Sequence, residues 1–152
     1  MNPGLVIRGR TVCVSTMAIP ALPGRALALA DVPDEPGRRM ATDIPELDRV
    51  LGGGLVPGSL VLVGGDPGIG KSTLVLQAAA RLAAQGQVVA YVCGEESPRQ
   101  VRMRATRLGV GAAPITLIPE SSLDAALAAA EGAGATVVII DSIQSVYIEG
   151  LE

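Results

Sequence analysis

The chain has 152 residues, 49% of them hydrophobic and 18% charged, a composition that suits one folded domain with an apolar core. Its formal net charge of −3 and its two aromatic residues, both tyrosine, argue against a protein that binds nucleic acid over its whole surface. The two cysteines, Cys13 and Cys93, form neither a CxxC pair nor a disulfide framework, which favours a reducing, cytoplasmic environment, and no apolar run is long enough to span a membrane.

Residues 1–39 predict a poorly structured N-terminal extension and linker. The apolar run over 11–19 favours one short strand, and the segment 31–39 is rich in proline, glycine and charge. The N-terminal part also has features of a secretory signal, with an AxA cleavage pattern at 28–30, but Pro20 and Pro23 weaken its apolar segment. We therefore expect the folded domain to begin near residue 40 and to cover 40–152.

The first elements of this domain are a short helix and a buried strand. Thr42 or Asp43 caps a helix that has Pro45 in its first turn and ends before the glycines of 52–54. A turn over 56–58 leads into the apolar run 59–63, which predicts a buried strand.

The next eight residues, 65–72, read GDPGIGKS and match the phosphate-binding loop pattern GxxxxGK[ST] between a strand and a helix. Glycines in such a loop permit close approach of the backbone, and the N–H groups that open the following helix face the anion. The predicted ATP-binding residues are Gly65, Asp66, Pro67, Gly68, Ile69, Gly70, Lys71, Ser72 and Thr73. Lys71 contacts the β and γ phosphates and assists catalysis, and the Ser72 hydroxyl is a ligand of Mg²⁺.

A chance glycine-rich turn is the alternative interpretation of this loop. Lys71 argues against it, because it is the only lysine in a chain whose other basic residues are all arginine. An arginine fork is too rigid and bulky for this position of the loop.

Beyond the loop, helix and strand patterns alternate. The helix that begins at the loop ends at Gly86, the next runs from a cap at Ser97 to 108, and a third covers 122–131. A continuous apolar run over 88–93 predicts a strand buried on both faces, with Cys93 as a core residue. Further strands are predicted over 115–118 and 136–140. The alternation predicts an α/β fold with a mostly parallel sheet.

Two acidic residues lie at the ends of predicted strands, where ligands bind in an open parallel sheet. We predict that Asp141 holds Mg²⁺ through water beside Ser72, and that Glu95 polarises the water that attacks the γ phosphate. The alternatives are a turn cap for Asp141 and an ordinary acidic helix start for Glu95.

Basic residues concentrate on the helix that follows Ser97. They are Arg99, Arg102, Arg104 and Arg107. Such a face is either a track for DNA, a contact with another subunit or, most often, a solvated surface. The apolar side of the helix contains Val101, Ala105 and Leu108 at helical spacing.

Longer stretches are more specific than the loop alone. They are TDIPELDRVLGGG at 42–54, VPGSL at 56–60, GGDPGIGKST at 64–73, YVCGEES at 91–97 and VIIDSIQS at 138–145. Together they resemble the bacterial RadA (Sms) DNA-repair ATPases, relatives of RecA. The resemblance implies a RecA-type P-loop core, with Glu95 as the catalytic glutamate and Asp141 as the Walker B aspartate. It also implies ATP hydrolysis in a homo-oligomeric ring that acts on single-stranded or branched DNA during strand exchange or branch migration.

The chain also departs from that family. Its members begin with a four-cysteine zinc module, whereas Cys13 is the only cysteine in that region, so no zinc site is expected. They continue well past the Walker B strand, so the chain resembles a truncated core. We predict an ATP-binding and ATP-hydrolysing domain of a RadA-like repair protein, with a regulatory nucleotide-binding module or an inactive fragment as alternatives.

Overall fold

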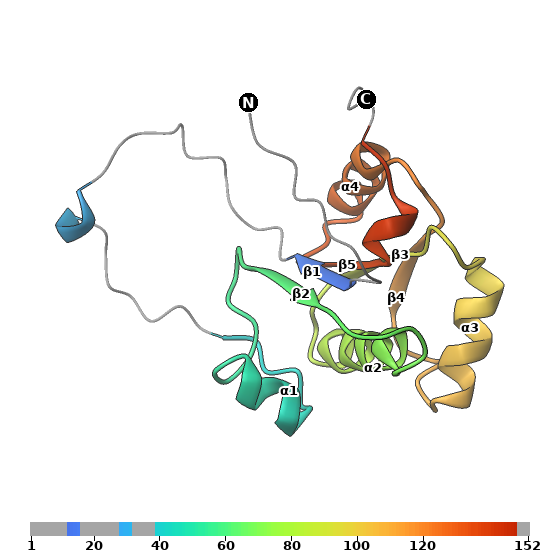
Figure 1. The fold of residues 1–152 in the computed structure, drawn as a ribbon, viewed down its shortest axis with the longest axis horizontal. Helices are drawn as coiled ribbons and strands as arrows, with labels where there is room; N and C mark the ends of the chain where they lie inside the picture. The colour runs from blue at the N-terminus through green and yellow to red at the C-terminus, as the bar shows by residue number, and fades with distance from the viewer. Residues whose placement is uncertain (1–11, 16–27, 32–38, 149–152) are drawn as a thin grey trace.

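The computed structural model describes residues 12–15, 28–31 and 39–148 of the chain (Figure 1). The secretory-signal pattern falls largely outside these residues. Within them the elements follow in the order β1 (Val12–Ser15), η1 (Leu29–Asp31), α1 (Pro45–Val50), β2 (Leu60–Val63), α2 (Lys71–Ala84), β3 (Val89–Val92), α3 (Pro98–Arg107), β4 (Ile115–Ile118), α4 (Leu123–Gly132), β5 (Val137–Asp141) and η2 (Ile143–Ser145). In the described part of the chain, no helix is long and apolar enough to cross a membrane.

A five-stranded sheet in the order β2-β1-β5-β3-β4 forms the centre of the molecule. β3 pairs in parallel with both β4 and β5, whereas β1 pairs antiparallel with β2 on one side and β5 on the other. Because β1 runs opposite to both of its neighbours, β2 and β5 point the same way. The predicted α/β fold with a mostly parallel sheet is confirmed, with β1 as its antiparallel strand.

Helices cover both faces of this sheet, as Figure 1 shows with α2 and α4 on opposite sides. Side chains of successive strand residues point to opposite faces. In β3, Val89 and Tyr91 pack in one core cluster with α2 and α3, while Ala90 and Val92 pack in a second cluster with α4. The strand is buried along its whole length, which explains its uninterrupted apolar sequence.

The start of α1 differs from the prediction. The N-cap residue is Ile44, which makes no side-chain cap, so neither Thr42 nor Asp43 has the predicted role. Thr42 is buried instead, and both its backbone N–H and its hydroxyl donate to Oδ1 of Asp48 at 2.8 Å. Its hydroxyl is therefore committed to a side chain inside the helix, while Pro45 occupies the first turn as expected.

The ends of the later helices agree with the prediction. Ser97 and Gln100 form a reciprocal capping box at the start of α3, and Ser122 caps α4. α2 ends beside Gly86, whose φ of 89° suits a residue without a Cβ. Ser97 and Ser122 follow β3 and β4, so these two caps lie at the carboxyl edge of the sheet.

Candidate functional site

The predicted phosphate loop joins β2 to α2 at the carboxyl edge of the sheet. Gly65, Gly68 and Gly70 all have positive φ angles, of 156°, 83° and 101°. The last of them is the N-cap of α2 and lacks a side chain, so no capping side chain accepts a hydrogen bond from the N–H groups of the first helical turn. The helix start therefore presents free donors and its positive dipole end, which together favour an anion.

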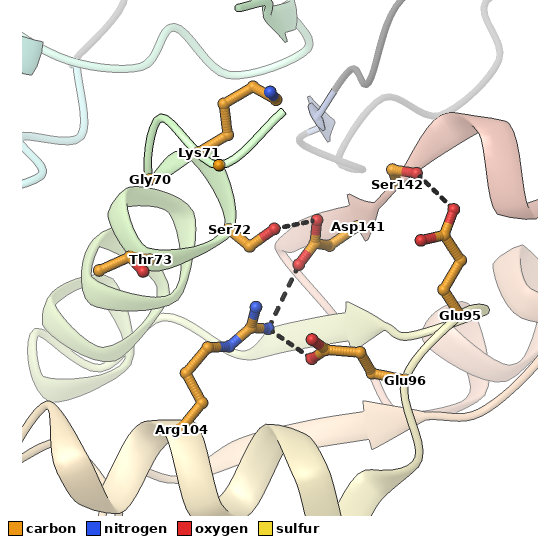
Figure 2. Close-up of a pocket in the computed structure, with 10 residues that line it drawn as sticks. Gly70, Lys71, Ser72, Thr73, Glu95, Glu96, Arg104, Asp141 and Ser142 are labelled. Atoms are coloured by element: carbon orange, nitrogen blue, oxygen red, sulfur yellow. Dashed lines mark hydrogen bonds and ion pairs between the residues drawn. The ribbon is translucent and has the colours of Figure 1, made fainter. Parts of the chain in front are cut away.

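Lys71 is the first residue of α2, and only 9% of its surface is exposed. Its Nζ donates to the carbonyl oxygens of Gly65 at 2.6 Å and Asp66 at 2.7 Å. In Figure 2 the side chain runs back along the loop that precedes it. The ammonium group therefore lies within the loop, where an incoming phosphate is a stronger acceptor than these carbonyl groups.

Ser72 and Asp141, the two predicted magnesium ligands, are in direct contact although they lie 69 positions apart. The Ser72 hydroxyl donates to Oδ1 of Asp141 at 2.8 Å (Figure 2). The contact follows from the topology, because β2 and β5 point the same way and both end at this edge. A hydroxyl and a carboxylate side by side are hard oxygen donors of the kind that Mg²⁺ prefers.

This oxygen pair suits an ion that takes most of its ligands from phosphate and water. Among the described residues there is no group of three or more histidine, cysteine, aspartate or glutamate side chains that could hold a metal alone. Mg²⁺ commonly binds through one or two protein oxygens together with substrate phosphates. The two residues therefore fit magnesium bound with a nucleotide better than a closed structural metal site.

Glu95 lies in the loop after β3 and reaches the same pocket from the other side. The hydroxyl of Ser142 donates to its Oε1 at 3.2 Å, as Figure 2 shows. Ser142 directly follows Asp141, and the peptide bond between them is cis. Glu95 is exposed in its loop, so water has access to its free oxygen.

Arg104 of α3 is a site residue that the sequence analysis did not single out. Its Nη2 lies 3.0 Å from Oε2 of Glu96 and 3.3 Å from Oδ2 of Asp141 (Figure 2), and donates to the Tyr91 hydroxyl at 3.1 Å. Position 104 lies three residues after buried Val101, so the helical period already placed it on the inner side of α3. The other three arginines of the helix are exposed.

Tyr91 was also missed, because it lies in a strand whose other residues are purely apolar. It is fully buried, and its hydroxyl donates to Oδ2 of Asp141. Burial, with the nearby Asp141 carboxylate as a further cause, raises the pKa of the phenol well above its ordinary value, so the group stays protonated and acts as a donor.

Most of the predicted site residues line one pocket together with Arg104, whereas Gly65, Asp66, Pro67 and Ile69 of the loop are not part of its lining. Its lining consists of Gly68, Gly70, Lys71, Ser72, Thr73, Glu95, Glu96, Arg104, Asp141 and Ser142. Cys93 lies outside it in the core, 2% exposed, and burial raises the pKa of its thiol, so it is a poor nucleophile at neutral pH.

The sequence profile described as "ATPase: KaiC" matches residues 40–117, just over half of the chain. The chain belongs to the KaiC ATPase family. The matched residues include the loop, Glu95 and Arg104, and end before β5.

The chain is also similar to proteins named DNA repair protein RadA. It is 47% identical to the one from Listeria monocytogenes over 125 residues, which are 82% of this chain and 27% of that protein. It is 55% identical to the one from Halalkalibacterium halodurans over 109 residues, 72% of this chain and 24% of that protein. A relative from Synechocystis is 42% identical over 146 residues, 85% of this chain and 29% of that protein. The resemblance drawn from the sequence is confirmed, and the chain spans about a quarter of the length of these relatives.

Proposed function

We propose that this chain binds ATP together with Mg²⁺ at the carboxyl edge of its sheet and forms the ATP-hydrolysing part of a DNA repair and recombination protein. The observation that supports this most directly is the hydrogen bond between Ser72 and Asp141. It brings a hydroxyl from the helix after the phosphate loop against a carboxylate from the end of β5. A glycine-rich turn that arose by chance has no reason to meet a buried-strand aspartate in this way.

The residues of the loop have separate tasks in this proposal. Backbone N–H groups of the loop and of the first turn of α2 bind the phosphate oxygens, with Thr73 nearest the α phosphate. Lys71 exchanges its bonds to the carbonyl groups of Gly65 and Asp66 for bonds to the β and γ phosphates. Ser72 and Asp141 hold the magnesium ion, which offsets the negative charge of the phosphates.

Glu95 is the proposed general base. The Ser142 hydroxyl holds one of its oxygens, which orients the carboxylate and leaves the second oxygen available to accept a proton from the attacking water. Lys71 and Glu95 are thus the proposed catalytic residues, one on the transferred phosphoryl group and the other on its nucleophile.

The wider setting of the activity rests on the relatives, which are named DNA repair protein RadA. We take single-stranded or branched DNA as the macromolecular partner, a homo-oligomeric ring as the assembly and the cytoplasm as the location. Stimulation of ATP hydrolysis by single-stranded DNA distinguishes this function from that of a regulatory module that only binds the nucleotide. A hydrolysis rate that does not change when DNA is added contradicts the DNA-processing role but not the proposed binding of ATP.

Lys71→Ala tests the nucleotide site itself. We expect affinity for Mg²⁺-ATP to fall at least about tenfold, since a charged hydrogen bond contributes about 1.5–3 kcal/mol. Calorimetric titration with ATP measures the change, and the unfolding transition shows whether the fold is intact. Arg99→Ala is the control, because it removes one exposed positive charge outside the pocket. Equal affinity of Lys71→Ala and the parent contradicts the assignment of the loop as the ATP site.

A further inference from the structure

The pocket lining carries more negative than positive charge. Three carboxylates line it, those of Glu95, Glu96 and Asp141. Two cationic side chains face them, and one of these, Lys71, is bonded to carbonyl groups of its own loop. Carboxylates within several ångströms of a bound phosphate repel it strongly where solvent is partly excluded. The remaining cation, Arg104, therefore decides how negative the pocket is before any metal arrives.

Arg104 is placed to offset two of these charges at once. Its side chain is 13% exposed and that of Asp141 is 10% exposed, so solvent screens their interaction little. The same Nη2 atom lies between the carboxylates of Asp141 and Glu96, at 3.3 and 3.0 Å. Figure 2 shows the guanidinium rising from α3 into the space between them.

Arg104 has both directional and purely electrostatic contacts, and its Nη2 donates hydrogen bonds to the Tyr91 hydroxyl at 3.1 Å and to Oδ2 of Asp141 at 3.3 Å. Its Nε is buried without a hydrogen-bond partner, and Oε2 of Glu96 lies at ion-pair distance without hydrogen-bond geometry. A buried polar atom left unpaired costs about as much as a hydrogen bond gains, so a purely structural ion pair would be expected to satisfy both. The contact with Glu96 therefore supplies charge without a hydrogen bond.

Asp141 has two hydrogen-bond partners besides Arg104. Its Oδ1 accepts from Ser72, and its Oδ2 accepts from the buried hydroxyl of Tyr91. Neither bond involves the guanidinium, so we expect both to remain when it is removed. Loss of Arg104 thus removes a positive charge and leaves the carboxylate aimed at Ser72.

From these contacts we infer that Arg104 is the resident counter-ion of the Asp141 and Glu96 carboxylates, and that its charge allows the pocket to bind ATP without a divalent cation. The inference rests on the proposed function, because it concerns the same nucleotide site. It assigns Arg104 to the metal-independent part of the affinity. Mg²⁺ supplies positive charge to the same region, so it compensates for the loss of Arg104.

The test compares ATP binding by the full chain with Mg²⁺ and with a chelator in its place. For Arg104→Gln we expect affinity for metal-free ATP to fall about tenfold or more, as one unit of charge near a phosphate is worth about that factor in a partly solvated site. Affinity for Mg²⁺-ATP should fall only a few-fold. Arg104→Lys keeps the charge without the planar fork and should recover most of the loss. Arg107→Gln, the same change at an exposed position of α3, should alter neither affinity more than about twofold.

Each result decides between roles. A defect confined to Mg²⁺-ATP shows that Arg104 orients the metal ligand, and an equal defect under both conditions shows a structural role; either overturns the inference. A parent chain that binds ATP only with Mg²⁺ also overturns it and leaves the proposed function standing. A parent chain that binds ATP under neither condition overturns both.

Discussion

Gly94 lies in the loop between β3 and Glu95, and the close packing around it predicts the effect of substituting it with alanine. A Cβ at this position would lie 2.6 Å from Oγ of Ser145 and 3.0 Å from both its Cβ and its carbonyl oxygen. Ordinary contacts begin near 3.4 Å. In Gly94→Ala the loop that contains Glu95 must therefore move away from η2, where Ser145 also donates from its hydroxyl to the carbonyl oxygen of Ser142 at 2.6 Å.

The cost should be that of overpacking, about 1–3 kcal/mol in the free energy of unfolding. Urea unfolding monitored by circular dichroism measures it, and ATP hydrolysis should fall as well because Glu95 moves relative to Ser142. Gly132→Ala is the matched control: this glycine lies in α4, nothing lies within 4 Å of a Cβ there, and the change should be neutral or stabilising.

A second substitution separates the clash from other effects. Ser145→Gly removes the two nearest side-chain atoms, so in the Gly94→Ala background it should restore part of the lost stability, although it destabilises the parent chain. The double-mutant cycle measures this coupling. If Gly94→Ala is as stable as the parent, or if the two changes are simply additive, the close packing of the Glu95 loop against η2 does not exist in solution.

Two further predictions concern acidic residues. Glu95→Gln should keep ATP affinity and lower the hydrolysis rate about a hundredfold or more, because the amide cannot accept the proton of the attacking water, while Glu96→Gln should do less; equal losses in single-turnover assays would remove Glu95 as the base. At Glu120, hydrogen bonds from the backbone N–H groups of Ser122 and Ser121 lower the pKa of the carboxyl group. The ionised Glu120 carboxylate thus stabilises the fold above the pKa that the group has in the unfolded chain, and this contribution is lost as pH falls through the lower pKa of the folded chain. Glu120→Gln should therefore be less stable than the parent at neutral pH and equally stable in acid. A stability difference that does not change with pH would show that these hydrogen bonds contribute nothing through ionisation.

The features that the sequence predicted well are those set by near neighbours. The phosphate loop is a run of eight residues, and the capping box of Ser97 and Gln100 spans four. The alternation of strands and helices follows from apolar runs and glycine stops, which also lie within single elements. The proximity of Ser72 to Asp141 was predictable because parallel strands end at one edge of the sheet.

The features that were missed depend on distant parts of the chain. Arg104 and Tyr91 meet at Asp141 only after α3 has packed against the sheet. The sequence of a basic helix does not distinguish an arginine that faces water from one that faces a carboxylate. Thr42 is a residue type that commonly caps helices, but it donates its hydrogen bonds to the Asp48 carboxylate instead. The roles of the site residues and the division of the chain at residue 39 stay predictions.

The antiparallel strand β1 has a consequence for the way the protein is made. β1 joins β2 to β5 in the sheet, and Val12 pairs with both Val63 and Asp141. During synthesis β1 therefore leaves the ribosome long before its second partner, β5, has been made. Pairing β1 with β5 then requires closing the long chain between them, which costs loop-closure entropy. Contacts between residues so far apart in sequence slow folding. Until β5 emerges, the phosphate loop and Asp141 cannot lie on one sheet, so the site is completed only after residue 141 has left the ribosome.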